Sequence, residues 1–147
     1  MKHQRQIALA ALSVFIFLFF SESAKAQALS DPGSAEALEK TTALLRDQSQ
    51  REKAISESPD AKKNHADLKE LAGSEENING AYGISANIFE KMVRDSGGDV
   101  SLMQKMIEKA QRDPSSFYES LTPDQKKNID ALAKQIESSK SNLSAAH

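Results

Sequence analysis

The stretch ISANIFEKMVRD, residues 84–95, decides the fold class of this chain. Its large apolar side chains recur at three- and four-residue spacing, the repeat that places side chains on one face of an α-helix. Polar and charged residues fill the positions between them. The pattern predicts an amphipathic helix whose buried face is formed by Ile84, Ile88, Phe89, Met92 and Val93.

The residues that follow repeat this pattern in three shorter segments. Gly97 and Gly98 end the first helix, and Asp99, Asp113 and Thr122 have the chemistry of helix caps. The predicted inner faces are Val100, Met103, Met106, Ile107 and Ala110; Phe117, Tyr118 and Leu121; and Ile129, Leu132, Ala133 and Ile136. No segment alternates with the period of a β-strand. We therefore expect an all-α protein, a small irregular bundle of short helices with its core in residues 78–137 and a flexible tail in residues 138–147.

Residues 27–77 are more polar than the segment that follows. Helix formers predict one helix over residues 35–57, and Ser58-Pro59 predicts the start of another that ends at Gly73. The apolar faces are thin, so we expect this part to be helical but loosely docked, or partly disordered. Gly80 and Gly83 predict a flexible region before a separate helix that Ser85 caps.

The first 26 residues have the organisation of a cleavable export signal. Lys2 and Arg5 precede an apolar run over residues 7–20, and Ala24-Lys25-Ala26 is a small-x-small cleavage site. An apolar run of this length is short for a spanning helix, which disfavours the alternative of an uncleaved membrane anchor. We expect a product that begins at Gln27, without stable membrane insertion, in the periplasm or secreted beyond the cell.

Composition and charge narrow the classes of function. The chain has no cysteine, so it would enter an oxidising compartment without disulfides. Removal of the signal leaves 16 basic and 20 acidic residues, a net charge of −4, which is unfavourable for binding nucleic acid.

Candidate groups for catalysis or metal binding are scarce in the sequence. His65 has no second histidine or cysteine at ligand spacing, and we interpret it as a surface residue. Ser85 lacks the strand and second glycine of a nucleophile turn. We therefore expect no catalytic residue, no metal and no cofactor, and a protein that is not an enzyme.

One cluster of apolar side chains has two interpretations. Methionine and aromatic residues on the predicted inner faces could line an adaptable surface for a protein or peptide, or could fill the core of a small domain. We favour the core, because the chain offers few other large apolar residues. The Met–aromatic cluster consists of Phe89, Met92, Met103, Met106, Phe117 and Tyr118.

The sequence Leu121-Thr122-Pro123-Asp124-Gln125, followed by an amphipathic helix, resembles the Leu-Thr-x-x-Gln box of the Spy and CpxP family. Members of that family are small helical, chaperone-like proteins of the bacterial periplasm. The resemblance covers about 17 residues, and the box occurs once here, whereas it usually occurs twice in the family. The resemblance implies a chaperone-like role in the periplasm.

These observations favour an exported, non-enzymatic protein of the bacterial envelope that binds another protein or a peptide, as a chaperone-like or accessory factor. The alternative is a secreted helical effector, inhibitor or toxin-like protein, because a signal peptide does not separate the two destinations. The sequence leaves the partner and the oligomeric state open.

Overall fold

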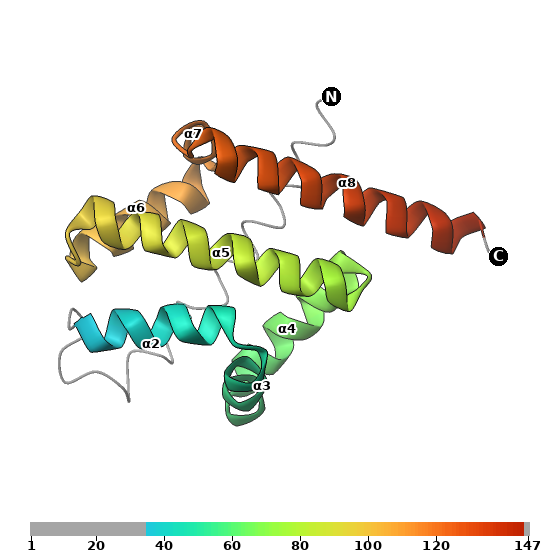
Figure 1. Ribbon diagram of the computed structural model, residues 1–147, viewed down its shortest axis with the longest axis horizontal. Helices are drawn as coiled ribbons and strands as arrows, with labels where there is room; N and C mark the ends of the chain where they lie inside the picture. Colours follow the sequence, from blue (N-terminus) through green and yellow to red (C-terminus); the bar gives the residue numbers. More distant parts are fainter. Residues whose placement is uncertain (1–34, 146–147) are drawn as a thin grey trace.

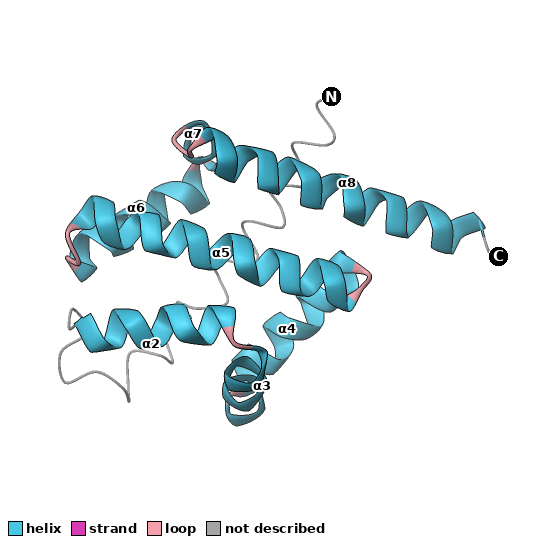
Figure 2. Cartoon of the chain, viewed as in Figure 1, coloured by secondary structure: helices cyan, strands magenta, loops and turns pink. Residues whose placement is uncertain are grey.

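The computed structural model describes residues 35–145, and this part of the chain is helical with no strand (Figure 2). The helices are α2 (Ala35–Arg46), α3 (Gln48–Glu57), α4 (Pro59–Ala72), α5 (Glu75–Ser96), α6 (Val100–Arg112), α7 (Pro114–Glu119) and α8 (Pro123–Ala145). The expectation of an all-α helical bundle is confirmed. The predicted signal over residues 1–26 lies outside the described residues.

Helix α5 is the centre of the bundle. It lies between α2 and α8 and also packs against α4 and α6 (Figure 1). Its predicted apolar face is buried at Ile88, Phe89 and Met92. Gly80 lies next to α8, since a Cβ there would be 3.4 Å from Leu132 Cδ1.

Three helix starts follow the predicted capping chemistry. The side chains of Ser58, Asp99 and Asp113 each accept a hydrogen bond from a backbone N–H in the first turn of the helix that follows. Gly73 and Gly97 end α4 and α5 in the left-handed conformation that glycine adopts without a steric penalty. These helix ends are therefore fixed by local chemistry that the sequence displays.

The predicted break before Ile84 is wrong. Helix α5 runs without interruption from Glu75 to Ser96, through both Gly80 and Gly83, and Ser85 lies inside it. A glycine inside a helix costs about 1 kcal/mol relative to alanine. Burial of side chains on the same helix, including Tyr82 and Ala86, offsets that cost.

The core is larger than residues 78–137. Leu45 of α2 and Leu68 and Ala72 of α4 belong to the same buried cluster as the side chains of α5 and α8. The C-terminal boundary also differs, because α8 continues to Ala145 through the predicted tail.

Candidate functional site

The Met–aromatic cluster is part of the core. Phe89, Met92, Met103, Phe117 and Tyr118 are buried, with Met103 only 3% exposed. Met106 is partly buried and packs against them. The Tyr118 hydroxyl donates a hydrogen bond of 2.9 Å to Asp130 Oδ1. The structure brings all six residues together, and their burial favours the core interpretation over an open binding surface.

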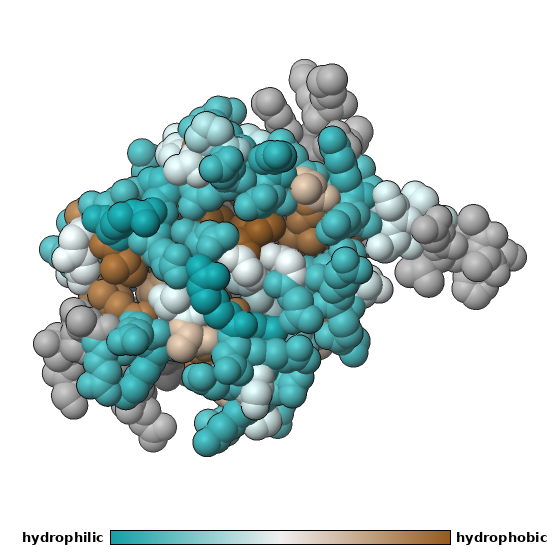
Figure 3. Space-filling model, in the orientation of Figure 1, coloured by the Kyte–Doolittle hydropathy of each residue, from teal (hydrophilic) through white to brown (hydrophobic). Residues whose placement is uncertain are grey.

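Hydrophobic groups on the surface are few. Among the side chains that the structure describes, Leu102 is the one large hydrophobic group classed as exposed, at 43%. The face in Figure 3 is mainly hydrophilic over the helices, and hydrophobic surface shows between them.

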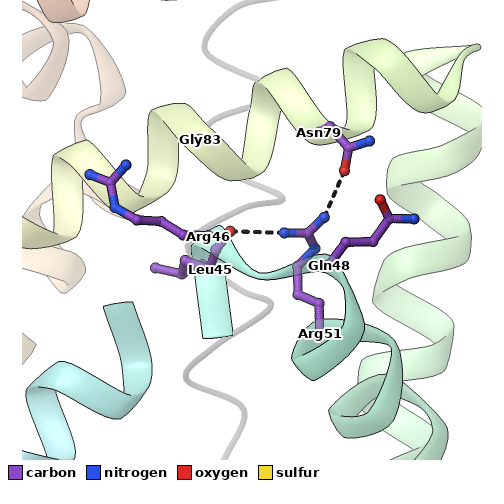
Figure 4. Close-up of a pocket in the computed structure, with 6 residues that line it drawn as sticks. All are labelled: Leu45, Arg46, Gln48, Arg51, Asn79 and Gly83. Carbon is purple, nitrogen blue, oxygen red and sulfur yellow. Dashed lines mark hydrogen bonds between the residues drawn. The ribbon is translucent and has the colours of Figure 1, made fainter. Parts of the chain in front are cut away.

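A pocket lies instead where the junction of α2 and α3 meets α5. Its volume is about 300 Å³. Figure 4 shows its position against the side of α5. We call it the Arg51 pocket, and its lining residues are Leu45, Arg46, Gln48, Arg51, Asn79 and Gly83.

Arg51 connects three helices at this pocket. From α3, its Nη1 donates to the Leu45 carbonyl of α2 at 2.9 Å. Its Nη2 donates to Asn79 Oδ1 of α5 at 2.6 Å. The guanidinium carbon also lies 4.2 Å from the centre of the Tyr82 ring, a cation–π distance. In Figure 4 the guanidinium stands between the Leu45 carbonyl and Asn79, beside Gln48.

Arg51 is a buried cation held by neutral groups. Its side chain belongs to a residue only 5% exposed, and it forms no salt bridge with any residue of the described chain. Burial lowers the pKa of the guanidinium, whereas Tyr82, Glu52 and Asp47 raise that pKa by their charges. Arginine still remains protonated in proteins. The site therefore holds a positive charge without a carboxylate in contact with it.

The second arginine at the pocket is already neutralised. Arg46 Nη2 lies 2.9 Å from Glu90 Oε1 and 2.9 Å from Asn87 Oδ1, both on α5. Its side chain points away from Arg51 in Figure 4. The two arginines thus differ in kind, since Arg46 forms an exposed ion pair and Arg51 does not.

Tyr82 extends the contacts of Arg51 to α4. Its hydroxyl lies 3.1 Å from His65 Nδ1, and the two rings are stacked with their centres 6.2 Å apart. Burial raises the pKa of the Tyr82 hydroxyl, although the charge of Arg51 lowers it. His65 is half-buried and bonded to a core tyrosine, so its interpretation as a simple surface residue is wrong.

The described residues offer no group of three histidine, cysteine or acidic side chains placed to hold a metal ion. A search of the same residues finds no helix with both the length and the apolarity to cross a membrane.

The sequence analysis did not identify Arg51, Asn79 or Gly83 as site residues. Gly83 was the one lining residue that the sequence analysis had singled out, as part of a flexible region; a glycine inside a helix can instead mark a packing or functional position.

The segment that resembles the Spy and CpxP box is the start of α8. Thr122 Oγ1 accepts from the Gln125 backbone N–H at 3.3 Å, and Gln125 Oε1 accepts from the Thr122 backbone N–H at 3.1 Å. Gln125 Nε2 also donates to the Asn87 carbonyl of α5 at 3.1 Å. The box therefore begins α8 and attaches it to α5.

Comparisons of the chain with protein-family models, curated protein sequences and solved structures found no match.

Proposed function

We propose that this chain is an exported, non-enzymatic binding protein of the bacterial envelope, which recognises another protein or a peptide as a chaperone-like or accessory factor. The observation that carries the proposal is the Arg51 pocket, where a buried cation without a carboxylate partner lines a cavity of about 300 Å³. A cavity of this size accommodates one side chain or one chain end rather than a folded domain. The partner would insert such a group and make its other contacts around the rim.

The proposal does not depend on an open methionine surface, because Met92 and Met103 are buried in the core. The partner would bind at the Arg51 pocket instead. The rim of the Arg51 pocket is accessible, since Gln48 and Asn79 are exposed. Recognition would therefore depend on a polar contact in a defined place.

Site-specific photo-crosslinking tests the proposal. The full chain is expressed in the envelope of its host with a photoreactive phenylalanine at position 48 or position 104. Gln48 lines the pocket, whereas Gln104 is an exposed glutamine on α6 and serves as the matched control. We expect protein adducts at position 48 and none at position 104. One dominant adduct would indicate an accessory role, and many adducts a chaperone.

Absence of adducts at position 48, or the same adducts at both positions, would contradict the proposal.

Export is tested on the same material by measurement of the intact mass of the protein. We expect the mass of a chain that begins at Gln27, because cleavage should follow Ala24-Lys25-Ala26. A retained segment of residues 1–26 with protein in the membrane fraction would instead show an anchor.

A further inference from the structure

The hydrogen bonds of Arg51 leave part of its guanidinium uncommitted. Two of its N–H groups bind the Leu45 carbonyl and Asn79 Oδ1. A guanidinium has more donors than these two bonds use, in a planar arrangement that suits a carboxylate or a phosphate. Buried charges in proteins are normally paired. The residue thus presents a buried charge and free donors at the wall of a cavity.

We propose that the Arg51 pocket binds a carboxylate group of the partner, with Arg51 as the cation that recognises it. This inference rests on the proposed function and adds the chemistry of the ligand. Gln48 lies on the rim, where its side-chain amide donates one N–H to Glu52 Oε1 at 2.8 Å and keeps a second N–H that a ligand could use. The missing side chain at Gly83 leaves open space for the carbon atoms that carry the carboxylate, since a Cβ at Gly83 would meet no atom within 4 Å.

The charges around the pocket favour a carboxylate over a phosphate. Arg46 is paired with Glu90, so Arg51 is the one arginine of the lining whose charge is not neutralised by contact. Asp47 and Glu52 add negative charge near Arg51 without touching it. Asp47 and Glu52 repel any anion, and they repel a phosphate of nearly two negative charges more strongly than a carboxylate of one.

Two substitutions on α5 form a matched pair. Asn79→Asp converts the group that accepts from Arg51 into a carboxylate and so supplies an internal anion in the pocket. Asn87→Asp makes the same chemical change at the amide that accepts from Arg46. Both variants alter the net charge equally and on the same helix. Only the first is expected to neutralise Arg51, and melting curves of both should show that the fold is kept.

The probes are three blocked tripeptides followed by NMR signals of the Arg51 Nε–H and the Gly83 amide. Acetyl-Gly-Glu-Gly-amide carries a side-chain carboxylate, acetyl-Gly-Gln-Gly with a free acid carries a terminal one, and acetyl-Gly-Gln-Gly-amide carries neither. We expect one of the two acids to shift both signals saturably and the neutral peptide to leave them unchanged. Which acid binds identifies the source as an acidic side chain or a chain end.

Asn79→Asp should weaken binding of that acid by about tenfold or more, the scale of one charged hydrogen bond. Asn87→Asp should change it by less than about twofold. Equal loss in both variants, no shift with either acid, or tighter binding of inorganic phosphate would overturn the inference. Crosslinking at position 48 without any carboxylate response would leave the proposed function standing and refute only the ligand class.

Discussion

Arg51 holds several helices together through one side chain. It satisfies one of the last carbonyls of α2, where the helix dipole also favours a positive charge, and it contacts Asn79 and Tyr82 of α5. Its stabilising role and its proposed binding role use different donors of the same guanidinium. The two roles can therefore be separated by substitutions at different places.

Arg51→Met should lower the free energy of unfolding by about 1–3 kcal/mol, because the buried acceptor of Leu45 loses its donor. The matched control is Arg46→Met, which removes an exposed ion pair worth about 0–1 kcal/mol. Urea denaturation of both variants checks the difference. Equal effects would show that Arg51 contributes no more to the fold than a surface arginine.

The methionines provide a second test at the level of single residues. Met103 is almost fully buried, whereas Met106 keeps part of its surface in solvent. Met103→Ala should therefore cost about 2–5 kcal/mol through lost transfer energy and a cavity. Met106→Ala should cost less. Thermal melts of both variants measure the difference. An unchanged melting temperature for Met103→Ala would mean that the Met–aromatic cluster does not stabilise the core.

At the scale of helices, the sequence predicted several caps and glycine stops, but the prediction of one helix over residues 35–57 is wrong, because Asp47 caps a second helix there. The caps at Ser58 and Asp99 and the glycine stops at Gly73 and Gly97 were predictable, since each depends on groups a few residues apart. The continuity of α5 was not, because it depends on packing against α2 and α8, which no local pattern reports.

The Arg51 pocket could not be predicted for the same reason. Arg51 and Asn79 are separated by 28 positions and meet only when α3 folds against α5. In sequence, Arg51 stands among polar residues that are typical of an exposed helix surface. The Met–aromatic cluster, in contrast, repeats at helical spacing, so its residues were identifiable before their packing was known.

The start of α3 gives a pH-dependent prediction. Asp47 accepts a hydrogen bond of 3.0 Å from the Gln50 backbone N–H, and this bond lowers the pKa of its carboxyl. A lowered folded-state pKa means that the cap stabilises the fold at pH values above the unfolded-state pKa, about 3.9. The contribution is lost as the pH falls through the folded-state value.

Wild type should therefore be more stable than Asp47→Asn at pH 7, and the difference should shrink as the pH falls below about 4. Chemical denaturation of both proteins across this range measures it. Asp124→Asn is a control, because Asp124 lies in the first turn of α8 rather than at a cap. A difference that stays constant with pH would show that the Asp47 charge is not the source of the stabilisation.

The whole molecule is arranged around α5, and this arrangement predicts how the fold opens. Helix α5 contacts helices on several sides and carries many buried residues, whereas in α3 the one residue classed as buried is Arg51. Segments with few buried apolar contacts open at low free energy. We therefore expect α3 to be the least stable of the described helices, rather than all of residues 35–57.

Hydrogen exchange followed by mass spectrometry tests this order of stability. Peptides from α3 should exchange first, those from α2 later because Leu45 is in the core, and those from α5 and α8 last. Arg51→Met should accelerate exchange in α3 and leave α8 unchanged, since Arg51 is the buried group that attaches α3 to its neighbours. Uniform protection from residue 35 to residue 136 would instead mean that all the helices unfold as one cooperative unit. In that case the Arg51→Met variant should accelerate exchange everywhere, which distinguishes a local attachment from a contribution to the whole fold.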